Sequence, residues 1–398
     1  MRSTAIGLRR KIITPGHLAL LGLMGLGLAM AIVRYIGGIG AISNLSDSYP
    51  WGLWISFDLL CGVALAAGAF VTASAVYILG IEEFRPILRP AILTGFLGYL
   101  MVVFALLVDL GHPERIWYLM IFWNPHSVMF EVGWCVMLYT AVLALEFSPL
   151  VFERLRMPST LRLIHAITIP LVILGTVLST LHQSSLGSLF SILPDKLSGL
   201  WFTPLLPAFF FLSAVAVGPA MVIFESTISS KVFKRGLEVE LLGKLALAIP
   251  VALGAYLVLK IADLAYAGEL DLMFKGNVET ALFWLELGGG VILPTILFLL
   301  PAIRSSAMGL FWGALLVIAG VVLNRFDTSL IGVARPEGAS YVPHILEFIV
   351  TISIIAAGVF AYSLVARFLP LFSEHVMAGA MHKEETPAFV FLAQIEST

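Results

Sequence analysis

The sequence predicts an all-α polytopic membrane protein of about ten transmembrane helices, and three observations support this class. Of the 398 residues, 60% are hydrophobic. Only 12% are charged, against about a quarter in soluble globular domains. Many apolar runs reach the ~20 residues that cross a ~30 Å hydrocarbon core. The lipid bilayer is therefore the expected surroundings of most of the chain. No basic stripe accompanies the net charge of −2, which argues against nucleic acid as a partner.

Ten apolar runs of spanning length follow one another along the chain. They lie near residues 17–39, 51–80, 87–110, 125–147, 160–182, 203–228, 241–264, 277–303, 308–325 and 344–370. The breaks between them are rich in Pro, Gly and charged residues, and only there can irregular backbone leave the hydrocarbon. The first run is longer than the apolar part of a signal peptide, so it is expected to remain as a span. Residues 1–370 should form one transmembrane domain, and 371–398 a short cytoplasmic tail.

The order of the spans suggests two bundles. Segments 51–182 and 203–325 each contain four predicted spans. Two four-helix bundles with a flanking helix at either end are therefore expected.

The distribution of Lys and Arg predicts the orientation. With ten spans, 16 of the 23 basic residues fall on the side that carries both termini. Basic loops stay in the cytoplasm. We therefore expect a multi-pass protein of the bacterial inner membrane with both termini cytoplasmic.

Several ionisable or polar side chains fall inside the predicted spans, where they are costly and usually face a cavity or a helix bundle. On the outer half, Asp58 and Glu131 are expected too deep for their carboxylates to reach the headgroups. Tyr99 is expected near mid-depth, and His182 should end the fifth span at the outer face. On the cytoplasmic half the candidates are Arg89, Glu146 and Glu225.

Other polar residues have simpler interpretations. Glu286 lies deep in the eighth span, whereas Lys260 and Asp263 stand three residues apart on one helix and are expected to pair. A set of tryptophans is expected to form an interfacial belt: Trp51, Trp54, Trp117, Trp123 and Trp201.

The sequence also argues against redox metals in this chain. The two cysteines, Cys61 and Cys135, are isolated in apolar segments, so neither an iron–sulfur cluster nor structural zinc is expected. Haem in a helix bundle needs histidines that face each other from within the spans. All eight histidines are expected at helix ends, in loops or in the tail, so no haem is expected.

Without its own metal, the chain can still react with an organic carrier dissolved in the membrane. A quinone needs an apolar, aromatic slot with a few hydrogen-bonding groups at its carbonyls. Its reduction also takes up protons. Asp58, Tyr99, Glu131 and His182 have suitable chemistry, because carboxyl, phenol and imidazole groups can each transfer a proton.

These residues lie in stretches that resemble the NrfD/PsrC family of membrane subunits, in particular its HybB-like ten-span branch. The resemblance covers roughly residues 10–370 and includes YPWGLWISFDLL (49–60) and LHQSSLGSL (181–189). Shorter matches are RPILRPA (85–91), ALEFSP (144–149), VIFE (222–225) and FWLE (283–286). The membrane subunit of the high-molecular-weight cytochrome c (Hmc) complex is a member of similar size.

The resemblance implies a subunit that exchanges electrons between a periplasmic ferredoxin-like iron–sulfur partner and menaquinone or ubiquinone. Multihaem cytochrome c or hydrogenase subunits, and other membrane subunits, would complete the complex. It implies a quinone site near the periplasmic face with Asp58, Tyr99 and His182, assisted by Glu131. It also implies a proton path through Arg89, Glu131, Glu146 and Glu225, possible proton translocation, and no catalysis without the partners.

Two other function classes remain open at this point. Carboxylates within spans and the glycine run 288–290 also suit a secondary transporter or ion channel. A purely structural membrane anchor of a periplasmic redox enzyme is the third interpretation.

Overall fold

The computed structural model describes residues 14–47, 49, 51–193, 196–334 and 341–372. Its described part contains ten helices long and apolar enough to cross a membrane. The regular structure of this part is helical apart from two isolated β-bridges, with loops and turns between the helices. The predicted all-α fold with ten spans is therefore confirmed. The tail after residue 372 and the basic N-terminal residues 2–11 lie outside the described residues.

The first five spans comprise one flanking helix and four packed helices. They are α1 (Pro15–Gly37), the composite span η2–α2–α3 (Trp54–Cys61, Gly62–Leu65, Gly68–Tyr77), α4 (Arg85–Asp109), α5 (Val128–Leu155) and α6 (Pro158–Ser191). Short 3₁₀ turns lie between them: η1 (Ile39–Ala41), η3 (Glu82–Phe84) and η4 (Pro113–Met120).

The last five spans begin with α7 (Leu206–Val232), whose residues pack against both groups of helices. They continue with α8–α9 (Val239–Leu245, Ala248–Ala267), α10–η6–α11 (Val278–Trp284, Leu285–Ile292, Leu293–Leu299), α13–η7 (Ala307–Phe326, Asp327–Ile331) and α14 (Ile345–Phe368). The connectors are η5 (Leu270–Phe274) and α12 (Pro301–Arg304).

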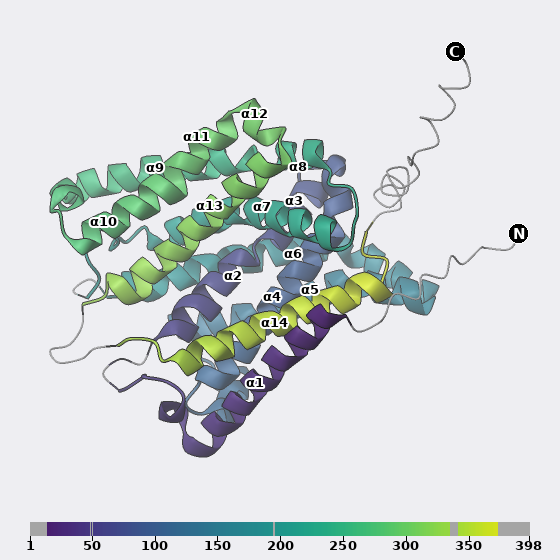
Figure 1. Ribbon diagram of the computed structural model, residues 1–398, viewed down its shortest axis with the longest axis horizontal. Helices are drawn as coiled ribbons and strands as arrows, with labels where there is room; N and C mark the ends of the chain where they lie inside the picture. Colours follow the sequence, from purple (N-terminus) through teal and green to yellow (C-terminus); the bar gives the residue numbers. More distant parts are fainter. Residues whose placement is uncertain (1–13, 48, 50, 194–195, 335–340, 373–398) are drawn as a thin grey trace, which may run out of the picture.

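Packing groups the spans as the sequence suggests. We call η2–α3 with α4, α5 and α6 the first half, and α7, α8–α9, α10–α11 and α13–η7 the second half. Helix α1 lies along α14, and this pair flanks the first half through α4 (Figure 1). One apolar core continues through both halves, from Leu60 and Val172 to Phe210 and Leu287.

The start of α1 and the end of α14 lie on the same side of the bundle of helices (Figure 1). We call this side the terminal face and the opposite side the far face. The basic residues assigned to the cytoplasm that the structure describes, such as Arg85, Arg154 and Lys231, lie toward the terminal face.

Three segments wind as π-helix: Trp54–Cys61, Leu285–Ile292 and Asp327–Ile331. Each contains one buried carboxylate, respectively Asp58, Glu286 and Asp327. π-Helical turns are rare and are frequent at functional sites. Close helix contact explains part of the glycine run 288–290, because a Cβ on Gly290 would lie 2.3 Å from the Cα of Gly320.

Candidate functional site

A buried histidine–tyrosine pair stands at the centre of the first half. His182 on α6 and Tyr99 on α4 are 0% and 1% exposed. The Tyr99 hydroxyl and His182 Nδ1 form a hydrogen bond of 2.9 Å. The edge of Tyr99 also meets the ring of Tyr139 on α5, with centroids 4.8 Å apart. The structure thus brings two of the predicted residues together and adds Tyr139, which the sequence analysis did not select.

The expected place of His182 at a helix end is wrong. Helix α6 continues to Ser191, so His182 lies well inside it. The following serines do not end the helix, because Ser185 and Ser188 donate to the carbonyls of Leu181 and Ser184, four residues earlier. The argument against haem from histidine positions therefore loses part of its basis, although the prediction itself stays.

Several polar atoms around this pair are buried and have no protein partner. They are His182 Nε2, Ser179 Oγ, Gln183 Oε1 and the Tyr139 hydroxyl. Gln183 is held in place because its Nε2 donates to the carbonyl of Val63, at 3.0 Å. Each unsatisfied buried polar group costs about 1–3 kcal/mol. Such a group of atoms needs an explanation, and a polar ligand or water that bonds them is the usual one.

A second feature connects this pair with the terminal half of α5. Tyr139 and Glu146 are seven residues apart, so they lie on the same face of the helix. That face meets α6 at Gly175, where a Cβ would lie 3.4 Å from both Glu146 Oε1 and the Tyr139 ring. The same Cβ would lie 3.2 Å from Val142 Cγ1, so the buried apolar side chain of Val142 lies between Tyr139 and Glu146 on this face.

Glu146 in turn borders a cavity of about 270 Å³ toward the terminal face. Arg85, Arg89, Glu153 and His165 also line it. Arg89 Nη2 donates to Glu153 Oε1 at 2.6 Å, and Nη1 donates to the carbonyl of Pro370 at 3.0 Å. The ion pair is partly exposed, with 42% and 26% of the two side chains accessible. Arg89 therefore belongs to the terminal half, as its helix position predicts.

Asp58 does not share these contacts. Its Oδ2 accepts a hydrogen bond of 2.7 Å from Thr351 on α14. The span that carries Asp58 contacts α6 farther along, where the carbonyl of Val63 accepts from Gln183 Nε2. Asp58 and His182 thus have partners on different helices, and the structure does not join them by a direct hydrogen bond.

Beyond Asp58, the far face has a polar cluster where α1, α4 and α14 meet. Arg34 Nε donates to the carbonyl of Val108 at 2.7 Å, next to the buried and unpartnered Asp109 Oδ1. Glu347 on α14 accepts from the backbone N–H of Asn44 at 3.0 Å and from the Tyr341 hydroxyl. Burial, followed by the hydrogen bond to Glu347, raises the pKa of Tyr341, which lies in the loop before α14. Tyr341 therefore stays protonated and donates to Glu347.

The predicted depth of Glu131 is wrong. Helix α5 begins at Val128 with Ser127 as its cap, so Glu131 lies in the first turn and is only partly buried. The partial positive charge of a helix N-terminus favours a carboxylate there. The helix N-terminus therefore explains why Glu131 is stable at the far face.

Glu225 lies on the other side of the first half, in α7. It accepts a hydrogen bond from the Tyr362 hydroxyl of α14, and its Oε2 is buried without a partner. Among the described residues no hydrogen bond or ion pair connects Glu225 with Glu146, so the structure leaves the two carboxylates of the predicted path on separate sides.

The second half contains a buried network that the sequence analysis underestimated. Glu286 accepts from Trp201 Nε1 at 2.8 Å, from Asn324 Nδ2 at 2.8 Å and from the Tyr256 hydroxyl at 3.3 Å. Arg325 donates to Asn324 Oδ1 at 2.6 Å and is fully buried. The clue was available in the sequence, since Arg325 and Asp327 lie near one end of a long apolar run.

Two simpler interpretations need correction here. Lys260 does not form an ion pair with Asp263 in the described structure. It lies 5.4 Å from the ring centre of Phe209, while Asp263 accepts from Thr203 Oγ1 at 2.8 Å. Trp54 and Trp201 are each 1% exposed and donate to Glu347 O and Glu286, so they are core residues and not part of an interfacial belt. Trp117 and Trp123 are exposed, as a belt requires.

Ten membrane-spanning helices around buried, hydrogen-bonded histidine, tyrosine and carboxylate groups define a polytopic membrane protein with a polar reaction or transport site. Comparison with known proteins gives the family. Residues 41–337 match the family described as polysulphide reductase, NrfD, and the chain belongs to it.

Three relatives cover nearly the whole chain. A Nitratidesulfovibrio vulgaris protein, named only "Protein", is 38% identical over 92% of this chain and 96% of its own length. The probable Ni/Fe-hydrogenase 2 b-type cytochrome subunit of Escherichia coli is 33% identical, covering 86% and 88%. The menaquinone reductase integral membrane subunit of N. vulgaris is 31% identical, covering 88% and 90%.

Proposed function

We propose that this chain is the quinone-reactive membrane subunit of a respiratory electron-transfer complex. The observation that carries the proposal is the buried His182–Tyr99 pair with unpartnered polar atoms around it. The substrate we propose is menaquinone or ubiquinone, and the name of the N. vulgaris menaquinone reductase subunit supports menaquinone. Electrons come from, or pass to, a ferredoxin-like iron–sulfur subunit at the far face.

The donor set fits a quinone carbonyl. If the Tyr99 hydroxyl donates to His182 Nδ1, the ring proton is on Nε2, and Nε2 can donate to a carbonyl oxygen. Ser179 Oγ and the Tyr139 hydroxyl offer further hydrogen bonds at the same place. The cavities of about 920 and 270 Å³ are lined by neither His182 nor Asp58. We propose that a quinone reaches His182 when side chains or helices of the first half move.

Reduction of a quinone takes up two electrons and two protons, and the chain offers a route for the protons. We propose that protons enter at the cavity beside Arg89 and Glu153 and reach Glu146. From there they pass along the face of α5 to Tyr139, then to Tyr99 and His182. Every group on this route can donate and accept a proton. Glu225 and Asp58 are proposed as separate proton-holding groups, and Glu131 as a group near the far face.

The excess of basic residues supports a cytoplasmic location for the terminal face in a bacterial inner membrane. Protons would then come from the cytoplasm while electrons stay at the periplasmic face, so turnover would move charge across the membrane. The partner at the far face would be an iron–sulfur subunit of a hydrogenase or of a multihaem cytochrome c complex such as Hmc.

We propose that the chain has no haem, although its E. coli relative is called a b-type cytochrome subunit. Haem needs two histidines that face each other with free ring nitrogens. Among the described histidines, buried His17 has both nitrogens engaged, with Thr14 and with Ser363 at 2.5 Å. His182 has one free nitrogen and faces Tyr99 and not another histidine. A reduced-minus-oxidised spectrum of the purified chain should show no haem b band.

The test uses the whole complex in proteoliposomes, with quinone reduction and membrane potential as readouts. His182→Ala should abolish most turnover, and Asp58→Asn should lower it. Glu240→Gln, at an exposed carboxylate, is the control for expression and assembly. Unchanged rates in His182→Ala would overturn the site, and normal rates without a potential would overturn the proton route.

A further inference from the structure

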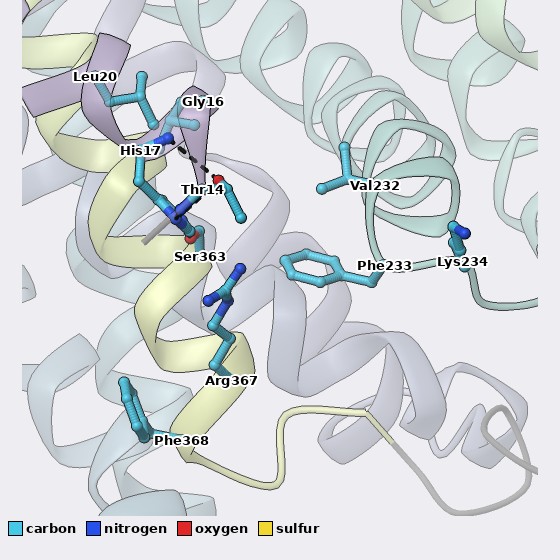
Figure 2. A pocket seen from close by; sticks show the side chains of 11 residues that line it. Thr14, Gly16, His17, Leu20, Val232, Phe233, Lys234, Ser363, Arg367 and Phe368 are labelled. Carbon is cyan, nitrogen blue, oxygen red and sulfur yellow. Dashed lines mark hydrogen bonds between the residues drawn. The ribbon is translucent and has the colours of Figure 1, made fainter. Parts of the chain in front are cut away.

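A second group of buried ionisable side chains lies in the second half, where η6 meets the end of α13. Its members come from three spans and are almost fully buried: Tyr256, Lys260, Glu286, Arg325 and Asp327. The groove of about 920 Å³ between the start of α1, the end of α7 and the end of α14 is lined by none of them (Figure 2). The cavity of about 270 Å³ beside Arg89 is not lined by them either. These two cavities therefore bring no water to the group.

Asp327 has no partner for a negative charge. It is 0% exposed, and among the described residues no donor bonds either of its carboxylate oxygens. None of the ion pairs in the described part of the chain includes it. An ionised carboxylate buried in this way within a membrane span is too costly to persist. Asp327 must therefore bind a proton or a cation.

Glu286 is in the opposite state. Its carboxylate accepts three hydrogen bonds, from Trp201, Asn324 and Tyr256. Arg325 donates to Asn324 Oδ1 and interacts electrostatically with Glu286. Hydrogen bonds from such donors favour the ionised form of a carboxyl group. Glu286 therefore carries the negative charge, and Arg325 balances it.

The carboxyl groups of Asp327 and Glu286 meet each other. Asn324 and Asp327 are three residues apart, so they lie on the same side of their helix. Asn324 donates to Glu286, and Asp327 is close enough to Glu286 for a hydrogen bond between the two carboxyl groups. Ionised carboxylates only accept, so this bond requires a proton on one of them. Because Glu286 has three donors and Asp327 has none, the proton belongs on Asp327.

The other titratable groups on the elements around the pair do not neutralise Asp327. They are Tyr256, Lys260, Glu279, Arg325 and Cys61. Lys260 Nζ lies 5.4 Å from the ring centre of Phe209 and forms no ion pair with Asp327 in the described structure. Arg325 uses Nη1 for Asn324 and Nη2 for Ser213. A bound cation is disfavoured as well, because the fully buried Arg325 already places a positive charge beside the pair.

We propose that Asp327 and Glu286 bind one proton between them and form a second proton-binding site, in the second half of the chain. The shared proton removes the repulsion between two carboxylates in contact, which cannot both be ionised at low cost. The pair lies apart from the proton route proposed for the first half. Its proton is therefore additional to the two that quinone reduction takes up, and the site does not depend on where quinone binds.

Infrared spectroscopy of the intact complex, without added quinone, tests this proposal. The wild type should show a carboxylic acid C=O band at neutral and mildly alkaline pH, and Asp327→Asn should lose one such acid group per chain. Asp271→Asn, at an exposed aspartate of the same half, is the matched control and should lose only bands of an ionised carboxylate. Asp327→Asn should also keep the unfolding temperature of the wild type, because its amide N–H can donate to Glu286 as the acid O–H does.

Loss of ionised carboxylate bands in Asp327→Asn, or a higher unfolding temperature, would show that both groups are charged and would overturn the proposal. If this variant does not assemble, Glu286→Gln decides. The acid band of Asp327 should then shift because its partner has changed, and a band that is unshifted or lost contradicts the shared proton. Stabilisation of the wild type by sodium chloride over choline chloride would assign the site to a cation instead. Quinone turnover in detergent should be unchanged in Asp327→Asn.

Discussion

At the residue scale, the tautomer of the His182 imidazole depends on Tyr99. A neutral imidazole has one donor and one acceptor nitrogen, and the partner of one fixes the role of the other. The Tyr99 hydroxyl engages Nδ1, so Nε2 is left to meet the substrate. Sequence reasoning found both residues but could not show that they touch, because they lie 83 residues apart and on different helices.

Tyr99→Phe tests this positioning role. Loss of the hydroxyl frees Nδ1, so the tautomer of His182 is no longer fixed and the affinity for quinone should fall about 10-fold, or about 1.4 kcal/mol. The measurement is the KM for quinone and kcat of the complex. Tyr266→Phe, at a 96% exposed tyrosine, is the control. An unchanged KM would show that Tyr99 does not act on the substrate through His182.

Substitutions at Tyr139 and Glu146 test catalytic function independently of stability. The Tyr139 hydroxyl is buried without a protein partner, so Tyr139→Phe should leave the free energy of unfolding unchanged or raise it. The same substitution, like Glu146→Gln, should slow quinone reduction because it interrupts the proton route. Turnover in proteoliposomes and thermal unfolding are the two measurements. A stable variant with full turnover would remove Tyr139 from the route.

At the scale of elements, helix type and approximate extent were predictable from the sequence, whereas helix ends and local winding were not. A run of apolar residues indicates each span. The hydroxyls of Ser185 and Ser188 donate to carbonyls within α6, so the helix continues beyond His182 although these residues are polar. Conversely, Ser127 caps α5 late and leaves Glu131 in the first turn. The π-helical winding at Asp58, Glu286 and Asp327 depends on packing between spans, which periodicity does not reveal.

The contact between α5 and α6 gives a prediction at this scale. Gly175→Ala places a methyl group 3.4 Å from Glu146 Oε1 and from the Tyr139 ring, and 3.2 Å from Val142 Cγ1. It should slow proton transfer between Glu146 and Tyr139 and cost less stability than a clash with backbone. Gly187→Ala should instead destabilise the protein by about 1–3 kcal/mol, because its Cβ would lie 2.5 Å from the backbone oxygen of Leu206.

The control for both is Gly254→Ala, which meets nothing within 4 Å. Thermal unfolding should show the largest loss in Gly187→Ala, quinone turnover should show the largest loss in Gly175→Ala, and Gly254→Ala should be unchanged in both. If Gly175→Ala lost stability as much as Gly187→Ala, its effect on turnover would say nothing about the route.

At the scale of the whole molecule, the two halves have different roles in this account. The first half holds the unpartnered polar atoms around His182. In the second half Trp201, Tyr256 and Asn324 satisfy Glu286, while Arg325 Nε and both carboxylate oxygens of Asp327 are buried without a partner. Glu286→Gln should destabilise the fold by about 1–3 kcal/mol, because one of its two acceptor oxygens becomes an NH2 group that faces the N–H or O–H donors around it. Quinone affinity per folded molecule should not change. A selective loss of affinity would move the site toward the second half.

The claim on which the others depend is that quinone reacts in the first half, beside His182. A photoreactive quinone analogue, bound to the intact complex and mapped by peptide mass spectrometry, tests it most directly. We predict labels on α4 and α6 near Tyr99 and His182, which excess quinone displaces and which His182→Ala weakens. Displaceable labels confined to α7–α13 would contradict the account.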